Sequence, residues 1–473
     1  MKKIVVTVIA ITAVAFLFAQ QQKEKIDNVK DKVVVFFNNK EADSIYSLAG
    51  AAFKKQLSDA NFKNVAENQL FPLGKMKSVD FEKFTKGVSK YKVTFDNFTA
   101  GMYLSLDTTD KLEVFLFQPY KDESVKRTSA VATDNPLLTE QDKFIDTVVK
   151  QYFTDPNTVG ASISVLKNGK IFFYNYGETK KGNHQLPTAH SIYEIGSISK
   201  TFTATLLAFA VHEGKVKLTD PVNKYLPKDI PALQFNGKPI TLEGLSNHSS
   251  GLPRLPDNLK EVMEDNPYKN YDEPAMMEFL KHVKLTREQG AEYEYSNFAV
   301  GLLGVILEKV YKKPYDQLVL EKICTPLQMT QTQQYIGKKD TALFVSGHNE
   351  QGKPVSQWDF KAIAAAGAIR TNTTDLIKYA NANLSTTIAG LNKALQLTHV
   401  KTFSKGTNEV GLGWHFIKLI DHMILSHGGG TGGFRTTISF DTDKKTAVVI
   451  LANSAIDLQS EGYKILNRLG TTE

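Results

Sequence analysis

The segment EIGSISKTFTATLLAFAVHEGK, residues 194–215, limits the fold of this 473-residue chain more than any other stretch. Ser197 and Lys200 stand three residues apart at the start of a long run of apolar and small residues. Residues at this spacing share one face of a helix, so the pattern predicts contact between the two side chains where a buried helix begins. Burial would lower the lysine pKa toward a value useful to a base, and a serine hydroxyl needs such help to act as a nucleophile. A solvated helix start explains most S-x-x-K matches, so the flanking sequence must decide between the two interpretations.

The segment EYEYSNF contains a second pair of polar side chains with regular spacing. Tyr295 and Asn297 are two residues apart, so in an extended loop both point to one side and Ser296 points to the other. Tyr295, if it lies near Lys200, could act as a base toward Ser197 and as an acid toward a leaving group. The amide of Asn297 could orient a substrate carbonyl. Taken alone, the same residues also fit a turn before a helix.

The segment HMILSHGGGTGGFRTTISF predicts a strand, a glycine-rich break and a second strand, with His427 at the junction. Glycines there would let a substrate backbone approach the strand and would let a peptide N–H point into a site. A phosphate-binding loop is disfavoured because no Gly-Lys-Ser/Thr follows, and a simple glycine turn is the other interpretation.

Together with ITLEGLSNHSSGLP and GLGWHF, these blocks stand in the order typical of one enzyme family. Residues from about 138 to 469 resemble the penicillin-recognising serine hydrolases, in particular their class C β-lactamase branch, which also holds esterases and D-amino-acid peptidases. The resemblance implies an α/β (α+β) domain with an antiparallel sheet flanked by helices. It also implies Ser197 as the nucleophile, Lys200 and Tyr295 as proton carriers, and Asn297 as a substrate-binding residue.

By the same resemblance, His427, Gly428 and Gly429 take the places of the family's third motif, usually K-T-G. Gly430 would then supply one oxyanion N–H, and the amide of Ser197 the other. A mostly neutral imidazole attracts a substrate carboxylate less than a lysine does. An esterase or D-peptidase is therefore favoured over an efficient β-lactamase.

The resemblance implies an enzyme that forms an acyl-enzyme with amide or ester substrates of the D-alanyl-peptide, small-ester or β-lactam kind, including cell-wall fragments. It implies no metal and no organic cofactor. The alternative function is a penicillin-binding or sensor-like protein that acylates slowly, or that binds cell-wall fragments without efficient turnover.

The remaining histidines show no paired metal-ligand spacing and are predicted to be packed or on the surface; they include His212, His248, His348 and His415. Cys324 is the only cysteine, so it can neither form an intramolecular disulfide nor anchor a zinc site. The formal net charge of +7 comes from lysines scattered among acids, and this distribution predicts no nucleic-acid partner.

The N-terminus MKKIVVTVIAITAVAFLFAQQQ predicts a signal peptide over residues 1–19, since it joins lysines, an apolar run and a small residue before a polar stretch. The alternative is a membrane anchor, for which the run is short. Cleavage would leave an exported, periplasmic or secreted chain without a stable membrane span.

Three further divisions of the chain are predicted. Residues 20–120 read as helices followed by strands, which indicates a small α+β accessory domain of cystatin-like or NTF2-like pattern. Such a domain is a structural or dimerising appendage, or else a peptide- or glycan-binding module. Residues 121–136 are polar and aperiodic, as in a linker, and residues 137–473 form the hydrolase domain.

Overall fold

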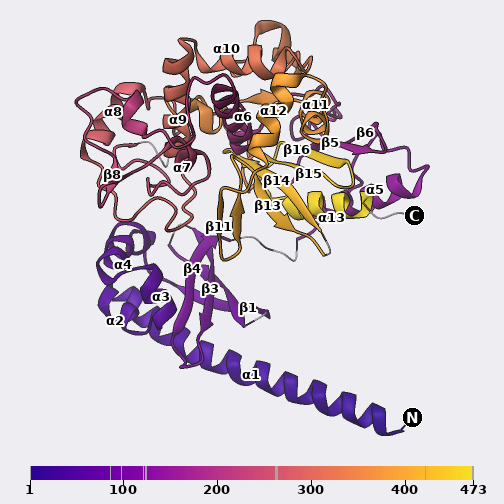
Figure 1. Ribbon diagram of the computed structural model, residues 1–473. Helices are drawn as coiled ribbons and strands as arrows, with labels where there is room; N and C mark the ends of the chain where they lie inside the picture. Colours follow the sequence, from indigo (N-terminus) through magenta and orange to yellow (C-terminus); the bar gives the residue numbers. More distant parts are fainter. Residues whose placement is uncertain are drawn as a thin grey trace. The chain divides into compact units, whose positions relative to one another are not determined.

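The structure is a computed structural model and describes residues 2–85, 87–96, 98–120, 122, 125–260, 265–420 and 422–470. It divides into two compact units, Met1–Val125 and Lys126–Glu473 (Figure 1). The predicted signal peptide lies outside the residues whose side chains are described. A search of the described residues found no helix with the length and apolar character needed to cross a membrane.

The first unit consists of helices followed by an antiparallel sheet in the order β1-β2-β3-β4, as the sequence predicts. Its helices are α1 (Lys2–Asn38), α2 (Ala42–Ser47), α3 (Ala51–Gln56) and α4 (Asp59–Val65). Its strands are β1 (Ser78–Thr85), β2 (Val88–Thr94), β3 (Thr99–Leu106) and β4 (Leu112–Pro119). Tyr91, Val93 and Phe95 alternate along the chain as in a strand, and all three are buried in the core of the unit.

The second unit is built on an eight-stranded antiparallel sheet in the order β11-β12-β13-β14-β15-β16-β5-β6. Its strands are β5 (Gly160–Lys167), β6 (Lys170–Gly177), β11 (Phe403–Lys405), β12 (Asn408–Val410), β13 (His415–Lys418), β14 (Met423–Gly430), β15 (Arg435–Asp441) and β16 (Thr446–Ala452). Short strand pairs outside this sheet are β7 (Tyr193–Glu194) with β10 (Arg370–Thr371), and β8 (Gln234–Phe235) with β9 (Lys238–Pro239). Strand β5 pairs with β16, so the sheet joins the beginning of the unit to its end.

Helices cover both faces of this sheet, which confirms the predicted arrangement (Figure 1). The helices of the unit are α5 (Glu140–Tyr152), α6 (Ser199–His212), α7 (Leu242–Ser246), α8 (Glu273–His282), α9 (Asn297–Tyr311), α10 (Tyr315–Val319), α11 (Thr373–Leu384), α12 (Ala389–Thr398) and α13 (Gln459–Leu469). One apolar core packs α5 and α13 against the sheet, through residues such as Ile145, Ile465 and Val448. The larger core packs α6, α9, α11 and α12 against the other face. The site described below lies at the start of α6.

The stretch 126–136, which the sequence analysis assigns to a linker, is bonded to the second unit. Arg127 donates through Nε to the carbonyl of Phe153 at 3.2 Å. The carbonyl of Ala132 accepts from the N–H of Gly177 at 2.8 Å. These bonds attach this stretch to the hydrolase domain.

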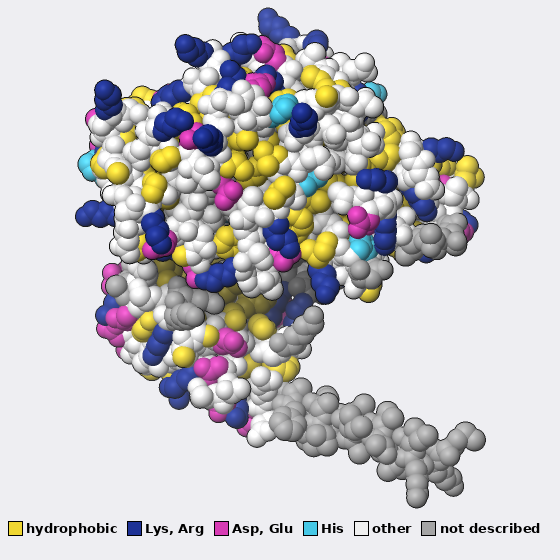
Figure 2. Space-filling view, viewed as in Figure 1, with side chains coloured by type: hydrophobic (Ala, Val, Ile, Leu, Met, Phe, Trp, Pro, Cys, Tyr) yellow, Lys and Arg dark blue, Asp and Glu magenta, His cyan; other side chains and the backbone are white. Residues whose placement is uncertain are grey.

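Lys and Arg side chains are spread over the visible face among acidic ones, and they form no continuous stripe there (Figure 2). Many of the cations are paired with carboxylates, for example Lys238 with Glu288 at 2.7 Å and Lys309 with Glu273 at 2.8 Å. On the face shown, charges of both signs are therefore interspersed.

Candidate active site

Ser197 and Lys200 are in contact, as the spacing predicts. Ser197 is the middle residue of a 3₁₀ turn, Gly196–Ile198, that leads directly into α6. Lys200 lies in the first turn of α6, with its Nζ 2.9 Å from the Oγ of Ser197 and 2.7 Å from the carbonyl oxygen of Ala366. Only 1% of Lys200 is exposed, so the amine is buried beside the hydroxyl.

The surroundings of Lys200 favour its neutral form. Burial lowers the pKa of Lys200 well below its usual value, and the positive charge of Arg254 adds to this effect. No carboxylate among the described residues forms an ion pair with Lys200. A neutral amine that donates to the Ala366 carbonyl still has a lone pair, which can accept the hydroxyl proton of Ser197.

Tyr295 lies against the same pair. The Nζ of Lys200 is 4.8 Å from the centroid of the Tyr295 ring, and the ring of His248 packs against Tyr295 at a centroid distance of 4.3 Å. Burial raises the pKa of Tyr295, and its hydrogen bond with Ser197 offsets only part of this rise. The phenol is therefore protonated at neutral pH and can donate a hydrogen bond or a proton.

The side chains of the YSN segment lie in different surroundings, and Tyr295, but not Asn297, lines the cleft described below. Ser296 is buried away from the cleft, donates to the Pro253 carbonyl at 2.6 Å and caps α9 by accepting from the Ala299 N–H at 2.9 Å. Asn297 begins α9, and its Nδ2 donates to the hydroxyl of Tyr268 at 3.4 Å. The Oδ1 of Asn297 is buried without a hydrogen-bond partner.

The position of His427 corrects one sequence-based prediction. His427 does not stand at a junction between strand and break, because β14 continues through Gly430, and His427 pairs with Ile438 of β15. The glycines remain extended because β15 pairs with them along their whole length. The break begins only after Gly430.

Glycine is required where β14 meets the serine. A Cβ on Gly429 would lie 2.0 Å from the carbonyl oxygen of Ile195, and one on Gly196 would lie 2.7 Å from the backbone nitrogen of Gly430. Gly196 also has a positive φ of 50°, which L-residues with a side chain rarely adopt. These contacts bring the Gly428–Gly430 strand against the Ser197 turn.

Three histidines gather around the site, and of these His427 was predicted there from the sequence, whereas His248 and His415 were not. His248 and His427 are buried as packed residues, and the ring centroids of His415 and His427 are 5.1 Å apart. The Nε2 of His415 lies 2.7 Å from the hydroxyl of Tyr293. Burial lowers the pKa of His415 to about 4 and the pKa of His427 well below its usual range, with nearby Lys200 contributing in both cases. All three imidazoles are therefore neutral near pH 7.

A cleft of about 610 Å³ opens above the serine. Of the predicted residues, Ser197, Tyr295, His427 and the Gly428–Gly430 segment line it, whereas Lys200 and Asn297 do not. Its other lining residues are Arg254, Trp358, His415, Ile417, Thr431, Arg435, Thr436, Asp457, Gln459 and Tyr463. Within the described part of the chain, no group of three or more His, Cys, Asp or Glu side chains is arranged to hold a metal ion.

Two of these residues carry signals that sequence reasoning could have used. Arg254 directly follows the HSSGLP block, and His415 ends the GLGWH block, so both are adjacent to segments already assigned to the site. Trp358 stands in a loop with no motif around it, and only the folded chain brings it to the cleft.

The sequence profile of the family described as "Beta-lactamase" matches residues 145–472. This chain belongs to the beta-lactamase family. It is a serine hydrolase of the penicillin-recognising kind, and the match begins within α5 and extends past the last helix of the second unit. The first unit lies outside the matched range.

Relatives of this beta-lactamase-family chain include enzymes of two kinds. A beta-lactamase of Pseudomonas fluorescens is 29% identical over 344 residues, and the match covers 65% of this chain and 92% of the relative. The D-alanyl-D-alanine-carboxypeptidase/endopeptidase AmpH of Escherichia coli K12 is 27% identical, covering 66% of this chain and 84% of the relative. A solved class C beta-lactamase superposes with a TM-score of 0.63 at 25% identity, over 71% of this chain and 99% of the other. A class C beta-lactamase solved in complex with cefoxitin also superposes with a TM-score of 0.63 at 26% identity, over 70% of this chain and 99% of the other.

Proposed function

We propose that this chain is an exported serine hydrolase that works through an acyl-enzyme on Ser197. The observation that carries the proposal is the contact of 2.9 Å between the Ser197 hydroxyl and the buried amine of Lys200. Burial of a lysine without a carboxylate partner destabilises the folded state, and a role as a base would explain why Lys200 is buried.

In the proposed acylation, the Oγ of Ser197 bonds to the substrate carbonyl carbon while its proton moves to the Nζ of Lys200. The backbone amides of Ser197 and Gly430 hold the oxygen that becomes negative. The carbonyl then re-forms, and the bond to the leaving group breaks. Water later attacks the ester carbon and releases the acid and the free serine.

Tyr295 completes the proton path in this proposal. The phenol is protonated near neutral pH, so it is better suited to give a proton to the departing amine or alcohol than to take one from serine. Lys200, whose pKa is lowered, is the better base. After Tyr295 has given its proton to the leaving group, the proton that Lys200 took from Ser197 can pass to Tyr295. Asn297 orients the substrate carbonyl, and the extended strand Gly428–Gly430 pairs with the substrate backbone.

The proposed substrates are amides or esters of the D-alanyl-peptide, small-ester or β-lactam kind. The printed activities of the two relatives, a beta-lactamase and a D-alanyl-D-alanine carboxypeptidase, support this range. The neutral His427 in place of the usual third-motif lysine favours esters and D-peptides over efficient β-lactam hydrolysis.

The proposal treats residues 20–120 as an accessory domain and residues 137–473 as the hydrolase domain. Two observations support this division: the family profile starts at residue 145, and the first unit has its own apolar core. In this proposal, the accessory domain is structural or dimerising and contributes no catalytic group.

A substrate panel tests the proposal. The purified mature protein is assayed with p-nitrophenyl esters, D-alanyl amides and a chromogenic cephalosporin, and the Ser197→Ala variant is assayed in parallel. We expect turnover of the esters or D-alanyl amides to exceed that of the cephalosporin, and to disappear in the variant. Equal turnover by both proteins would refute the proposed function. A burst of product equal to one enzyme equivalent, without further turnover, would identify the slow-acylating alternative.

A further inference from the structure

One cation in the cleft, Arg254, has no carboxylate partner within the part of the chain that the structure describes. Arg254 is exposed and lines the cleft, and its guanidinium lies 5.1 Å from the centroid of the Tyr295 ring. No carboxylate among the described residues pairs with it. Its carbonyl accepts N–H bonds from Asn297 at 3.0 Å and Phe298 at 3.2 Å, so its backbone is fixed to the start of α9. A fixed backbone and a free guanidinium make Arg254 available to a ligand.

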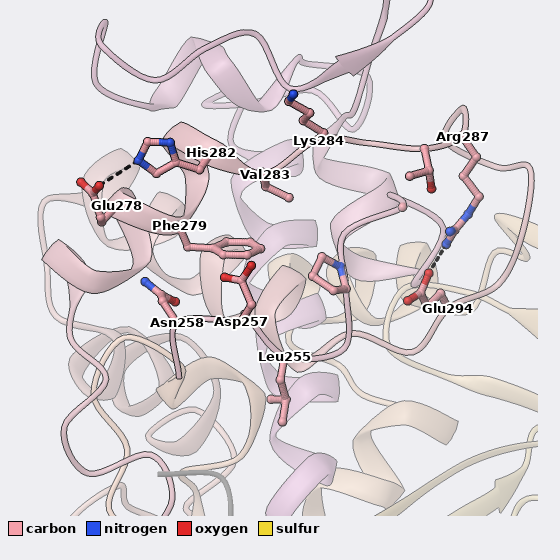
Figure 3. A pocket seen from close by; sticks show the side chains of 13 residues that line it. Leu255, Asp257, Asn258, Glu278, Phe279, His282, Val283, Lys284, Arg287 and Glu294 are labelled. Carbon is pink, nitrogen blue, oxygen red and sulfur yellow. Dashed lines mark hydrogen bonds and ion pairs between the residues drawn. The ribbon is translucent and has the colours of Figure 1, made fainter. Parts of the chain in front are cut away.

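The other guanidinium groups nearby are already engaged. Arg435, which also lines the cleft, donates through Nη1 to the carbonyls of Thr431 at 2.8 Å and Phe434 at 2.9 Å. A second hollow, of about 520 Å³, is lined by residues that flank Arg254 in the sequence (Figure 3). There Arg287 is paired with Glu294, and the figure shows the two side chains directed at each other.

The residue at the family's usual cation position does not supply a charge. His427 is 2% exposed, and its Nδ1 lies 2.7 Å from the carbonyl oxygen of Gly428, so that nitrogen carries the proton of a neutral ring. Of the two arginines that line the cleft, Arg435 donates to backbone carbonyls, which leaves the guanidinium of Arg254, on the segment between α7 and α8, to meet a carboxylate that enters the cleft.

The position of Arg254 also indicates which part of the substrate it meets. Tyr295 is the proposed proton donor to the leaving group, and Arg254 lies beside that ring. A carboxylate on the leaving group, rather than on the acyl group, would reach the guanidinium. Arginine suits this task because its planar donors match the two oxygens of a carboxylate.

We propose that Arg254 is the specificity residue of the cleft and that it binds a carboxylate carried by the leaving group of the substrate. This inference rests on the proposed function, and it narrows the substrate class to amides and esters whose departing half is an anion. The D-alanyl type of substrate, which ends in a carboxylate, fits this description, whereas a neutral alkyl ester does not.

A matched pair of esters tests the inference in the full-length protein. The phenylacetyl ester of 3-hydroxybenzoate carries a carboxylate on the leaving group, and the phenylacetyl ester of 3-hydroxybenzamide is its neutral analogue. Both are assayed with the wild type, with Arg254→Gln, and with Lys260→Gln as the control. Lys260 is an exposed cation six residues further along the chain that does not line the cleft.

We expect Arg254→Gln to lower the ratio of kcat/KM for the carboxylate ester to that for the neutral ester by about 10- to 100-fold. Lys260→Gln should leave the ratio unchanged. Arg254→Lys should keep a part of the preference, because it keeps the charge but not the planar donors. In the wild type, rising ionic strength should weaken turnover of the carboxylate ester alone, since an exposed charge is screened.

Two results would overturn the inference. An unchanged ratio in Arg254→Gln means that the guanidinium does not meet the carboxylate. An equal loss with both esters means that Arg254 acts on Lys200 and Tyr295 instead. If the wild type hydrolyses neither ester, that result counts against the proposed function and not against the role of Arg254. The role of Arg254 is then tested by binding, as the ratio of the Kd of 3-hydroxybenzoate to the Kd of 3-hydroxybenzamide. Equal Kd ratios in the wild type and Arg254→Gln would refute the inference there too.

Discussion

Replacement of Lys200 with Met removes the amine, keeps an unbranched apolar stem, and should change both catalysis and the pH dependence of stability. The lost base should lower kcat/KM for a small ester by at least about a hundredfold, a typical magnitude for a positioned general base. The amine is buried beside Ser197, and its bond to the Ala366 carbonyl is also lost. The catalytic effect should therefore appear in kcat rather than in KM.

The effect on stability has a definite sign. In the unfolded chain the Lys200 amine keeps its proton up to about pH 10.4, whereas burial depresses its pKa in the folded chain. Between these two pKa values the unfolded state binds more protons, so the free energy of unfolding of the wild type rises with pH by at most about 1.4 kcal/mol per pH unit. The Met variant lacks this rise. Its stability relative to the wild type should thus be highest at low pH and fall as the pH approaches about 10.

Denaturant unfolding of both proteins over this pH range, together with ester kinetics, measures both effects. Lys217→Met is the control, because Lys217 is an exposed lysine near the other end of α6 and should alter neither quantity. A difference in unfolding free energy that does not change with pH would show that Lys200 is charged in the folded protein. A catalytic loss below about threefold would remove it from the mechanism.

Three further predictions address other parts of the molecule. His427→Gln should leave the preference between carboxylate and neutral esters within about threefold. In the wild type, a pH change from about 8 to about 6 should not alter this preference, because burial keeps the imidazole neutral. A tenfold fall in the preference in either test would contradict the prediction. Gly429→Ala should lower both the melting temperature and ester turnover, since its Cβ would lie 2.0 Å from the Ile195 carbonyl oxygen. In Gly428→Ala the Cβ would meet only a flexible side chain, at 3.2 Å, so both quantities should fall much less. Equal losses in the two variants would refute the packing argument. A chain of residues 126–473 should fold, as circular dichroism would show, and keep its rate on a small ester; a folded but inactive chain would mean that the first unit completes the site.

Local spacing was enough to predict the central pair and much of the first unit. The three-residue interval between Ser197 and Lys200 is typical of one face of a helix, and the alternation of Tyr91, Val93 and Phe95 is typical of a strand. Each local pattern therefore predicts which side chains share a face. The same spacing argument does not describe Asn297, because Tyr295 lines the cleft and Asn297 does not.

The rest of the site depends on contacts between distant segments. Gly429 meets Ile195 across 234 positions of sequence, and only the register of an eight-stranded sheet sets that approach. The partners of Lys200 likewise include the carbonyl of Ala366, which no side-chain motif records. His427 was misplaced at a strand end because glycines usually weaken strands, whereas here pairing with β15 keeps them extended.

Labelling of the active-site serine tests the central claim most directly. The full-length protein is treated with a fluorophosphonate probe, digested and analysed by mass spectrometry, alongside Ser197→Ala and Ser199→Ala. Ser199 is the matched control, because it stands two residues away but is fully buried, and its Oγ accepts from the Ile369 N–H at 3.1 Å. The account predicts a single adduct on the peptide that contains Ser197, lost in Ser197→Ala and kept in Ser199→Ala. An adduct on another residue, or labelling that survives Ser197→Ala, would contradict it.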